Sequence, residues 1–389
     1  MLESLLAYKW IILFYLAVFL LVFLNRKRLE IHMGVFAMYK SRLGIGLMDA
    51  IALRFPRFVK SLGYTGIIFG FLGMAVVVGF IFYGLYALIF VPDAPAQISP
   101  VIPGVKIPGT SFFIPFWFGI IGIFLVAVVH EFGHGVVARA HRVPIKSTGP
   151  FVLGPFFGAF VEPDEKVLAK KRDIVKYSIF AAGPFFNFLL AALCFALVNF
   201  ALAPALLSYY TPAGVSFDDF SPGSPAESSG LEQGVVYSSF NGVEVQDTND
   251  LVRVLSALKP GDQLTVANAA SSVTFALAEN PASRSKPYMG VLGINNRFSE
   301  DGSFGFRAFM SLFELLQLVF ILSLGIGTAN LLPIGPIDGG RMVALPLSHF
   351  FGEELGKVIW ARLSVVFLIF IFLLMTPIFR ETFRMFFGA

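Results

Sequence analysis

The chain has 389 residues, of which 56% are hydrophobic and 14% are charged. Soluble globular chains contain about 45–50% apolar and about 25% charged residues, so this composition excludes an ordinary soluble protein and indicates a polytopic α-helical membrane protein. The formal net charge of +4 relates to membrane orientation, and no nucleic-acid partner is expected. Cys194 is the single cysteine, which excludes an intrachain disulfide and a cysteine-rich metal site.

Apolar runs with few or no charges mark the expected membrane spans, because a helix needs about 20 residues to cross roughly 30 Å of hydrocarbon. We interpret six runs as spans: residues 5–24, a stretch within 61–92, 112–138, 177–206, 308–336 and 363–377. The first run is not expected to be a cleaved signal peptide, because its basic cluster Arg26-Lys27-Arg28 follows the apolar residues instead of preceding them.

Lysine and arginine residues between the spans predict the orientation, because they gather on the cytoplasmic side. Residues 25–60 and 139–176 carry eight each, whereas residues 93–111 carry one. The two basic loops lie two helices apart and should share the cytoplasmic side, which puts both termini outside. Arg380 and Arg384 near the C-terminus run against this bias, but the bias of the loops is larger.

Residues 147–161 form an uncharged segment of a different kind, which is only 15 residues long. Pro150, Pro155 and three glycines interrupt it, so it is too short and too broken for a spanning helix. We predict a re-entrant or interfacial hairpin sheltered by protein, because lipid would leave its backbone groups unsatisfied. An ordinary surface loop is the alternative.

Residues 211–300 have the composition of a small soluble domain, with charges, turn residues and short alternating strands over about 215–296. We predict an inserted α+β domain outside the cytoplasm. The chain would then divide into the first helix with its basic loop (residues 1–60), a membrane core (61–210), this domain, and a C-terminal membrane core (301–389).

The order of pieces in this domain resembles the PDZ domains of bacterial membrane and periplasmic proteases. The matching residues are Ser224-Pro225-Ala226-Glu227, Gly230-Leu231, Asn241-Gly242 and Pro260-Gly261-Asp262. One departure is that Gly234 is followed by Val235, where members of that family usually have aspartate. The resemblance implies that peptide tails bind by adding a strand to a sheet edge, and a domain that only blocks or spaces is the alternative.

The third span contains the motif His130-Glu131-Phe132-Gly133-His134. Histidines at i and i+4 of a helix lie on one face, so both imidazoles can bind one metal ion, and the glutamate between them can act on a water molecule. The pattern predicts a zinc site with Glu131 as the catalytic residue. His134 lies five residues before Arg139 and therefore roughly 7 Å below the cytoplasmic surface. An ionisable cluster inside a span is costly, which indicates function.

Catalytic zinc takes three protein ligands and a water, so the two histidines need a third partner. Asp338 follows the fifth apolar run and lies three residues before Arg341, at a depth that matches His134. Pro333, Pro336 and a pair of glycines break the helix and let the carboxylate turn inward. We predict Asp338 as the third ligand, and the alternative is an aspartate that caps a turn.

Two asparagines enter spans near the membrane midplane. Asn187 lies 11 residues after Lys176 and Asn330 lies 11 residues before Arg341, so both should be roughly 16 Å deep. Their amides are predicted to bind a substrate backbone or an oxyanion, with hydrogen bonding between helices as the alternative. Three other histidines lack ligand spacing and are expected in loops or interfaces: His32, His141 and His349.

Three motifs together resemble those of the site-2 protease family of intramembrane zinc metalloproteases, over about residues 112–377. They are His130-Glu131-Phe132-Gly133-His134, Gly183-Pro184-Phe185-Phe186-Asn187, and Asn330-Leu331-Leu332-Pro333 followed by Asp338-Gly339. The resemblance implies that His130, His134 and Asp338 bind one zinc ion and that Glu131 is the base. It also implies cleavage within transmembrane segments of single-span membrane proteins, after another protease has trimmed them. The first two helices lie outside the resemblance.

Other functions are weighed on the same residues. A membrane zinc protease with glutamate as the third ligand is disfavoured by Asp338-Gly339 and by Asn187. A membrane zinc sensor or transporter would need polar residues along a transmembrane path, and the other spans offer few. A catalytically inactive PDZ scaffold is disfavoured by the intact Glu131. The sequence therefore favours a zinc-dependent intramembrane protease.

Overall fold

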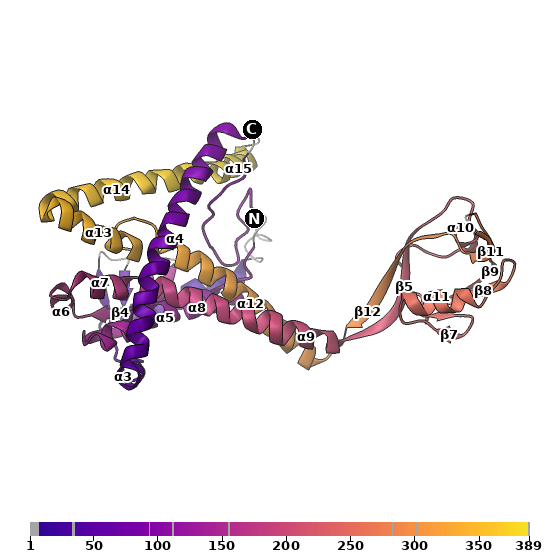
Figure 1. Ribbon diagram of the computed structural model, residues 1–389, viewed down its shortest axis with the longest axis horizontal. Helices are drawn as coiled ribbons and strands as arrows, with labels where there is room; N and C mark the ends of the chain where they lie inside the picture. Colours follow the sequence, from indigo (N-terminus) through magenta and orange to yellow (C-terminus); the bar gives the residue numbers. More distant parts are fainter. Residues whose placement is uncertain are drawn as a thin grey trace. The chain divides into compact units, whose positions relative to one another are not determined.

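The computed structural model describes residues 8–32, 36–92, 94–110, 113–154, 156–281, 283–300 and 302–387. The chain forms two compact units, which are coloured along the sequence in Figure 1. The first unit contains Met1–Val198 together with Phe313–Ala389, and the second contains Asn199–Leu312. Each unit has its own cluster of buried hydrophobic residues.

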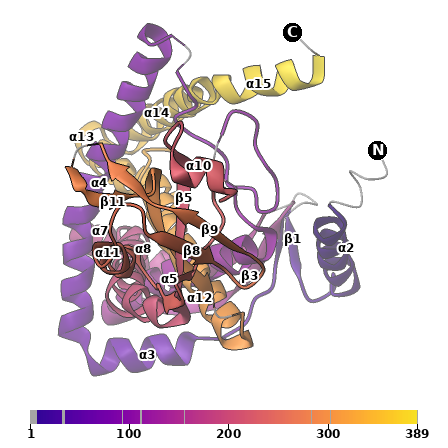
Figure 2. The ribbon, with the colours of Figure 1, turned by 90° about the vertical axis from the view of Figure 1, so that its right-hand side faces the viewer.

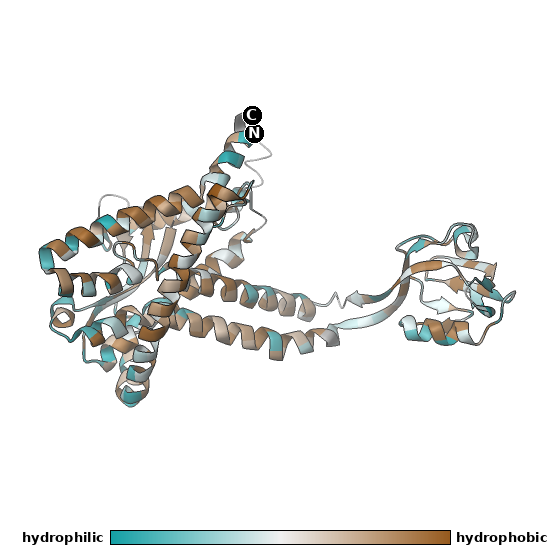
Figure 3. Cartoon of the chain, turned by 45° about the horizontal axis from the view of Figure 1, so that its top comes forward, coloured by the Kyte–Doolittle hydropathy of each residue, from teal (hydrophilic) through white to brown (hydrophobic). Residues whose placement is uncertain are grey.

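Long apolar helices make up most of the first unit. Five helical segments are long and apolar enough to cross a membrane: Pro56–Phe90, Phe116–Ala140, Asp173–Leu206, Phe304–Ala329 and Glu353–Leu374. Figure 3 shows hydrophobic residues along most of the length of these helices. Five of the six predicted spans fall on these segments, as expected for a polytopic membrane protein.

The predicted first span, residues 5–24, is the exception. Its described part is α2 (Lys9–Leu24), an apolar helix of 16 residues, and residues 5–7 lie outside the described ranges. A helix of that length rises about 24 Å, which is short of roughly 30 Å of hydrocarbon. The ring of Phe14 lies 5.3 Å from the ring of Phe116 and 6.1 Å from that of Phe157, so α2 packs on other parts of the first unit.

Helix α5 lies at the centre of the first unit, where it packs against α3, α4, α7 and α8. The described helices of this unit are α2, α3 (Ile45–Arg54), α4 (Pro56–Phe90), α5 (Phe116–Ala140), α6 (Glu165–Ala169), α7 (Asp173–Phe180), α8 (Ala182–Ala196), the larger part of α12 (Phe304–Ala329), α13 (Asp338–Phe351), α14 (Glu353–Leu374) and α15 (Thr376–Phe387). Glycines let these helices approach closely, as is usual in membranes. A Cβ on Gly63 of α4 would lie only 2.9 Å from Cγ1 of Val137 on α5.

Two spans have other boundaries than predicted. In the region predicted as a span at 308–336, helix α12 extends over Phe304–Ala329. It ends earlier than predicted because Pro333 and Pro336 cannot continue a helix. The run predicted at 363–377 covers the second half of α14, which extends from Glu353 to Leu374, and the first residues of α15. Charged residues in the first turns of α14 interrupt the apolar run but not the helix.

An antiparallel sheet lies beside α5 (Figures 1 and 2). Its order is β1 (Glu30–His32), β2 (Phe36–Met38), β3 (Ile145–Leu153) and β4 (Phe156–Pro163). β3 and β4 form a hairpin that turns at Gly154, whose φ of +56° favours glycine. A hairpin at residues 147–161 is thereby confirmed against the surface-loop alternative. Pro155 lies outside the described residues, and the re-entrant position in the membrane stays a prediction.

The first two strands correct the interpretation of the N-terminal region. We predict residues 1–60 as a helix followed by a basic loop, yet Ala37 of β2 pairs with Val152 of β3. The Nζ atom of Lys40 lies 3.1 Å from a carboxylate oxygen of Glu162, at the far end of β4. The N-terminal region therefore builds one edge of the sheet. Among the described residues β4 pairs with β3 alone, so β4 is the other edge.

The second unit contains strands and short helices. Its elements after α8 are η1 (Leu197–Leu202), α9 (Ala203–Leu206), η2 (Leu207–Tyr209), β5 (Tyr210–Phe220), α10 (Pro225–Ser229), β6 (Ser239–Phe240), β7 (Val243–Glu244), α11 (Thr248–Ser256), β8 (Gln263–Ala267), β9 (Ser272–Ala276), β10 (Ala278–Asn280), β11 (Ser283–Tyr288) and β12 (Val291–Glu300), followed by the start of α12. The strands pair in the orders β7-β6-β8-β9, β12-β5 and β10-β11.

The core of the second unit is formed by fully buried side chains that include Phe217, Phe240, Leu251 and Leu264. Asp247 caps α11 by accepting a hydrogen bond from the backbone N–H of Asp250, which is typical of a helix N-terminus. The PDZ resemblance of residues 211–300 stays a prediction.

Candidate metal centre

His130 and His134 lie one turn apart on α5 and converge on one point. Their Nε2 atoms are 3.2 Å apart, and the side chain of His130 is only 8% exposed. The i, i+4 spacing produces this arrangement, because such residues are neighbours on the surface of a helix.

Asp338 meets both histidines from the first residue of α13. Its Oδ2 lies 3.0 Å from Nε2 of His130, and its Oδ1 lies 3.3 Å from Nε2 of His134. These three residues are the one group within the described parts of the chain that could hold a metal ion. The predicted third ligand is therefore brought to the histidine pair.

The loop between α12 and α13 is folded tightly to place Asp338. The N–H of Gly339 donates to the carbonyl of Asn330 at 2.7 Å. A Cβ on Gly339 would collide with the backbone of Leu331, and one on Gly340 would collide with the carbonyl of Gly335. Glycine is required at both positions because the backbones of the loop and the helix touch.

The ligand atoms are close enough to share one zinc ion. Bonds of about 2.0–2.1 Å in tetrahedral geometry place ligand atoms about 3.3 Å apart. The two Nε2 atoms are 3.2 Å apart, and each lies 3.0 or 3.3 Å from a different carboxylate oxygen of Asp338. One ligand atom from each of the three residues lies within 4.8 Å of the others. Oδ2 of Asp338 is buried and makes no hydrogen bond. A buried carboxylate oxygen normally has a partner, so a cation among these three residues satisfies it.

A backbone carbonyl orients the ring of His134. Its Nδ1 lies 2.6 Å from the carbonyl oxygen of Ile179 in α7, which can only accept a hydrogen bond. Nδ1 therefore carries the proton and Nε2 is left free to bind a metal. Metal-binding histidines usually donate their other ring N–H in this way.

Asn187 takes the same role for His130. The amide of Asn187 lies 3.0 Å from Nδ1 of His130 and is fully buried on α8. If Nδ2 of Asn187 faces the ring of His130, then Oδ1 of Asn187 has no hydrogen-bond partner. When Nε2 of His130 binds a metal, its Nδ1 carries a proton. We therefore assign the amide orientation in which Oδ1 of Asn187 accepts a hydrogen bond from this Nδ1–H. The predicted contact of Asn187 with substrate stays a prediction.

Asn330 stabilises the end of α12. Its Nδ2 donates to the carbonyl of Ile326 at 3.0 Å, and its own carbonyl holds Gly339. A substrate role for Asn330 also stays a prediction. His141 lies just after α5 with its Nε2 3.2 Å from Oγ of Ser178, and it does not belong to the metal group.

The side chain of Glu131 contacts the sheet. Its Oε2 accepts a hydrogen bond from the backbone N–H of Val161 on β4 at 2.8 Å. Glu131 also lines a cavity of about 240 Å³. The cavity walls are mostly apolar and include Phe124, Val128 and Phe160. The carboxylate therefore lies between the metal ligands, the edge of a sheet and an apolar cavity.

Gly183 is a site residue to which sequence reasoning gave no role, although it opens the motif Gly183-Pro184-Phe185-Phe186-Asn187. A Cβ at this position would lie 2.5 Å from Nε2 of His130 and still closer to Nε2 of His134. A methyl group there would occupy the space that the metal needs. The sequence indicates this glycine only as the first residue of the motif that ends at Asn187, and nothing in the motif shows that the glycine lies against the imidazoles.

Comparisons with known proteins agree with this geometry. The model of peptidase family M50 matches residues 118–374, which contain both histidines, Glu131 and Asp338. The zinc metalloprotease RasP of Shouchella clausii is 23% identical over 59% of this chain and 65% of its own length. A protein of Clostridium perfringens with the provisional name zinc metalloprotease is 23% identical over 65% of this chain and 93% of its own.

An uncharacterized protein of Methanocaldococcus jannaschii is 30% identical, but over only 38% of each chain. The chain thus spans between 38% and 93% of the length of these relatives. Two of these relatives are named as zinc metalloproteases, and the donor set of His130, His134 and Asp338 is one that suits zinc. The match covers well over half of the 389 residues, and the chain belongs to peptidase family M50.

Proposed function

We propose that the chain is a zinc-dependent intramembrane protease that hydrolyses peptide bonds within transmembrane segments of other membrane proteins. The observation that carries this proposal is that Asp338 of α13 meets His130 and His134 beside Glu131, and that the two histidines and Glu131 lie on a helix apolar enough to span a membrane. A zinc sensor or transporter would not need a carboxylate held next to the ligands and the cavity.

The residues of the site supply the parts of a hydrolase. Zinc, when bound, supplies a Lewis acid for the scissile carbonyl and lowers the pKa of water. Glu131 accepts the proton of the attacking water and passes it to the leaving amine. Asn187 and the carbonyl of Ile179 keep both imidazoles in the tautomer that leaves Nε2 for the metal.

The free edge of β4 is proposed to hold the substrate. A helical substrate hides its carbonyls in backbone hydrogen bonds, so it must unwind before it can be cut. An extended segment can then pair with β4, by the strand addition used in many peptide-binding domains. The N–H of Val161 points from this edge to Glu131, so a strand bound there would pass beside the catalytic carboxylate. The adjacent apolar cavity suits a hydrophobic side chain of the substrate.

The remaining parts of the proposal rest on sequence. The expected substrates are single-span membrane proteins, including ones trimmed beforehand by another protease. The active site is proposed near the cytoplasmic side, because residues 139–176 after α5 carry eight lysine and arginine residues. Residues 211–300 are proposed to bind peptide tails outside the cytoplasm.

The test is cleavage by the pure protein in lipid vesicles that contain a single-span substrate. Glu131→Gln keeps the shape of the side chain and removes the base. General base catalysis usually contributes about 10²–10⁴-fold to the rate, so the cleavage rate should fall by at least that factor. Zinc per chain should not change, because the ligands His130, His134 and Asp338 are intact. Glu354→Gln, on an exposed turn of α14, is the control and should cleave normally.

Two results would contradict the proposal. Near wild-type cleavage by Glu131→Gln, or cleavage that a zinc chelator does not stop, would exclude this site as the protease centre. Loss of zinc together with activity would instead make Glu131 a ligand or a support of the ligands. Wild-type protein that binds zinc but cuts none of the substrates offered would favour the sensor, the transporter or the scaffold.

A further inference from the structure

A basic pocket of about 440 Å³ lies along one face of α4, separate from the metal ligands. It is lined by Arg57, Lys60, Ser61, Tyr64, Thr65 and Ile68. Residues with these three- and four-residue spacings form one stripe on a helix. The stripe runs from two cations through three hydroxyl groups to an exposed isoleucine.

The two cations of this pocket have no acidic partner among the residues that the structure describes. The carboxylates of Asp49 and Asp173 lie on α3 and α7, which pack against α4, and they pair instead with Arg139 and Lys176. Two cations that share a pocket repel each other, so an anionic ligand between them would be stabilised.

A further cation acts on the wall of the pocket. The ring of Tyr64 lies 5.6 Å from that of His141, which is buried behind it. Burial, and after it the charges of Lys60 and Lys171, lower the pKa of His141 to about 4. The imidazole is therefore neutral at physiological pH, and Lys171 adds its field to that of the two lining cations.

The position of the stripe along α4 matches a boundary between headgroups and hydrocarbon. α4 has 35 residues and is about 52 Å long, whereas the hydrocarbon layer is roughly 30 Å thick. Its ends must therefore reach the headgroup regions. Residues 61–92 carry no charge, so Arg57 and Lys60 mark one boundary. Tyrosine is common at that level, and Ile68, 62% exposed, lies on the hydrocarbon side.

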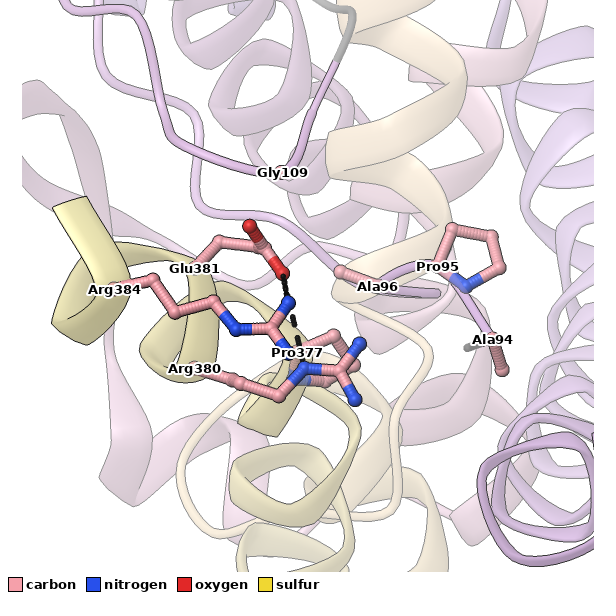
Figure 4. Close-up of a pocket in the computed structure, with 8 residues that line it drawn as sticks. All are labelled: Ala94, Pro95, Ala96, Gly109, Pro377, Arg380, Glu381 and Arg384. Carbon is pink, nitrogen blue, oxygen red and sulfur yellow. Dashed lines mark hydrogen bonds and ion pairs between the residues drawn. The ribbon is translucent and has the colours of Figure 1, made fainter. Parts of the chain in front are cut away.

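A second pocket with two arginines lacks this arrangement. Figure 4 shows Arg380 and Arg384 in a cavity of about 290 Å³, both beside Glu381. The ion-pair distances to the Glu381 carboxylate are 3.8 Å and 2.9 Å. This carboxylate offsets part of the positive charge and would repel a phosphate, so the second pocket is poorly suited to an anion.

We propose that the α4 pocket binds the headgroup of an anionic phospholipid. Arg57 and Lys60 contact the phosphate, the hydroxyls of the next turn lie at the level of the glycerol esters, and the acyl chain lies against Ile68. Basic pockets at the cytoplasmic ends of membrane helices recognise lipid headgroups in this way. The ligand is a lipid and not a free anion, because the same pocket passes from charge to an apolar surface.

The experiment measures lipid binding directly. Protein in detergent is titrated with phosphatidylglycerol or phosphatidylcholine, and bound lipid per chain is counted by native mass spectrometry. Wild-type protein should bind phosphatidylglycerol more tightly. Arg57→Gln combined with Lys60→Gln should weaken this binding about 30-fold, because each cation near an anionic headgroup contributes about fivefold.

Two more variants and one competitor complete the test. Lys27→Gln with Arg28→Gln removes two exposed cations outside the pocket and should bind lipid as the wild type does. Ser61→Phe keeps both pocket cations but fills the pocket, so it should also bind the lipid more weakly. If the variant with Arg57→Gln and Lys60→Gln does not fold, the lipid binding of Ser61→Phe is the test of the proposal. Undiminished binding by Ser61→Phe, or equal losses in the control variant, would overturn the proposal. The proposal would also be overturned if inorganic phosphate bound as tightly as phosphatidylglycerol and displaced it, because the ligand would then be a free anion.

Discussion

At the residue scale, the metal centre depends on a position that has no functional group. Gly183 lies where α8 passes the two imidazoles, and any side chain there would enter the metal position. The ligands themselves follow from sequence, because the spacing of His130 and His134 predicts their convergence. The need for glycine at 183 does not follow, since it comes from the approach of two helices that are far apart in the chain.

Gly183→Ala is expected to abolish zinc binding while the protein stays folded. The added methyl group would lie 2.5 Å or less from both Nε2 atoms, so the ligand geometry cannot form. Zinc per chain is measured by mass spectrometry of the purified protein, alongside its thermal unfolding. Gly79→Ala on α4 is the matched control, because nothing lies within 4 Å of a Cβ there. Full zinc content in Gly183→Ala would show that the metal binds elsewhere.

Asn187 also belongs to this scale, and its two possible roles can be separated. If its amide orients His130, then Asn187→Leu should weaken zinc binding about 10–100-fold, as is typical when such partners are lost. Asn187→Asp should keep most of the affinity, because a carboxylate oxygen can accept the same Nδ1–H. Competition with a zinc chelator measures both variants. Unchanged zinc affinity with impaired cleavage in Asn187→Leu would point to the substrate contact that the sequence suggests.

At the element scale, the helices could be predicted and most of the sheet could not. Uncharged runs of about 20 residues identify spans by length alone, and Pro333 and Pro336 account for the end of α12. The hairpin of β3 and β4 is local and was visible in its prolines and glycines. β1 and β2 are only three residues long each, and the pairing of β2 with β3 joins segments more than 100 residues apart. No local pattern encodes such a contact.

The free edge of β4 leads to a prediction about substrate binding. The backbone N–H of Val161 points away from β3 and donates to Glu131. Backbone N–H groups two residues apart in a strand point to the same side, so the N–H of Ala159 also points to the free edge. Ala159→Pro should remove that donor without breaking the β3–β4 ladder, since proline is tolerated on sheet edges. One lost hydrogen bond of about 1 kcal/mol should lower kcat/KM about fivefold, with zinc unchanged. Ala159→Ser keeps the N–H and serves as the control. Equal cleavage by both variants would argue against strand addition at this edge.

At the scale of the whole molecule, the candidate catalytic and metal-binding residues belong to the first unit and not to the second. All three metal ligands, Glu131 and the residues that orient the imidazoles lie in the first unit. Composition alone predicts this division, because charges and turn residues return between the fourth and fifth apolar runs. Composition does not predict that the N-terminal region, outside the family match, contributes two strands to the sheet next to Glu131.

The last prediction tests this separation. Replacing residues 211–300 by a flexible glycine-serine linker should leave about one zinc per chain, because the described residues of the second unit contribute no ligand and form their own core around Phe217 and Leu264. If the second unit selects substrates by their tails, the shortened protein should cut a different set of single-span proteins, or cut the same set with altered preference. Zinc content and a panel of substrates are measured together, with Glu131→Gln in the shortened protein as the inactive control. Loss of zinc would show that the second unit is needed to assemble the membrane core. An unchanged substrate preference would favour a domain that only spaces or blocks.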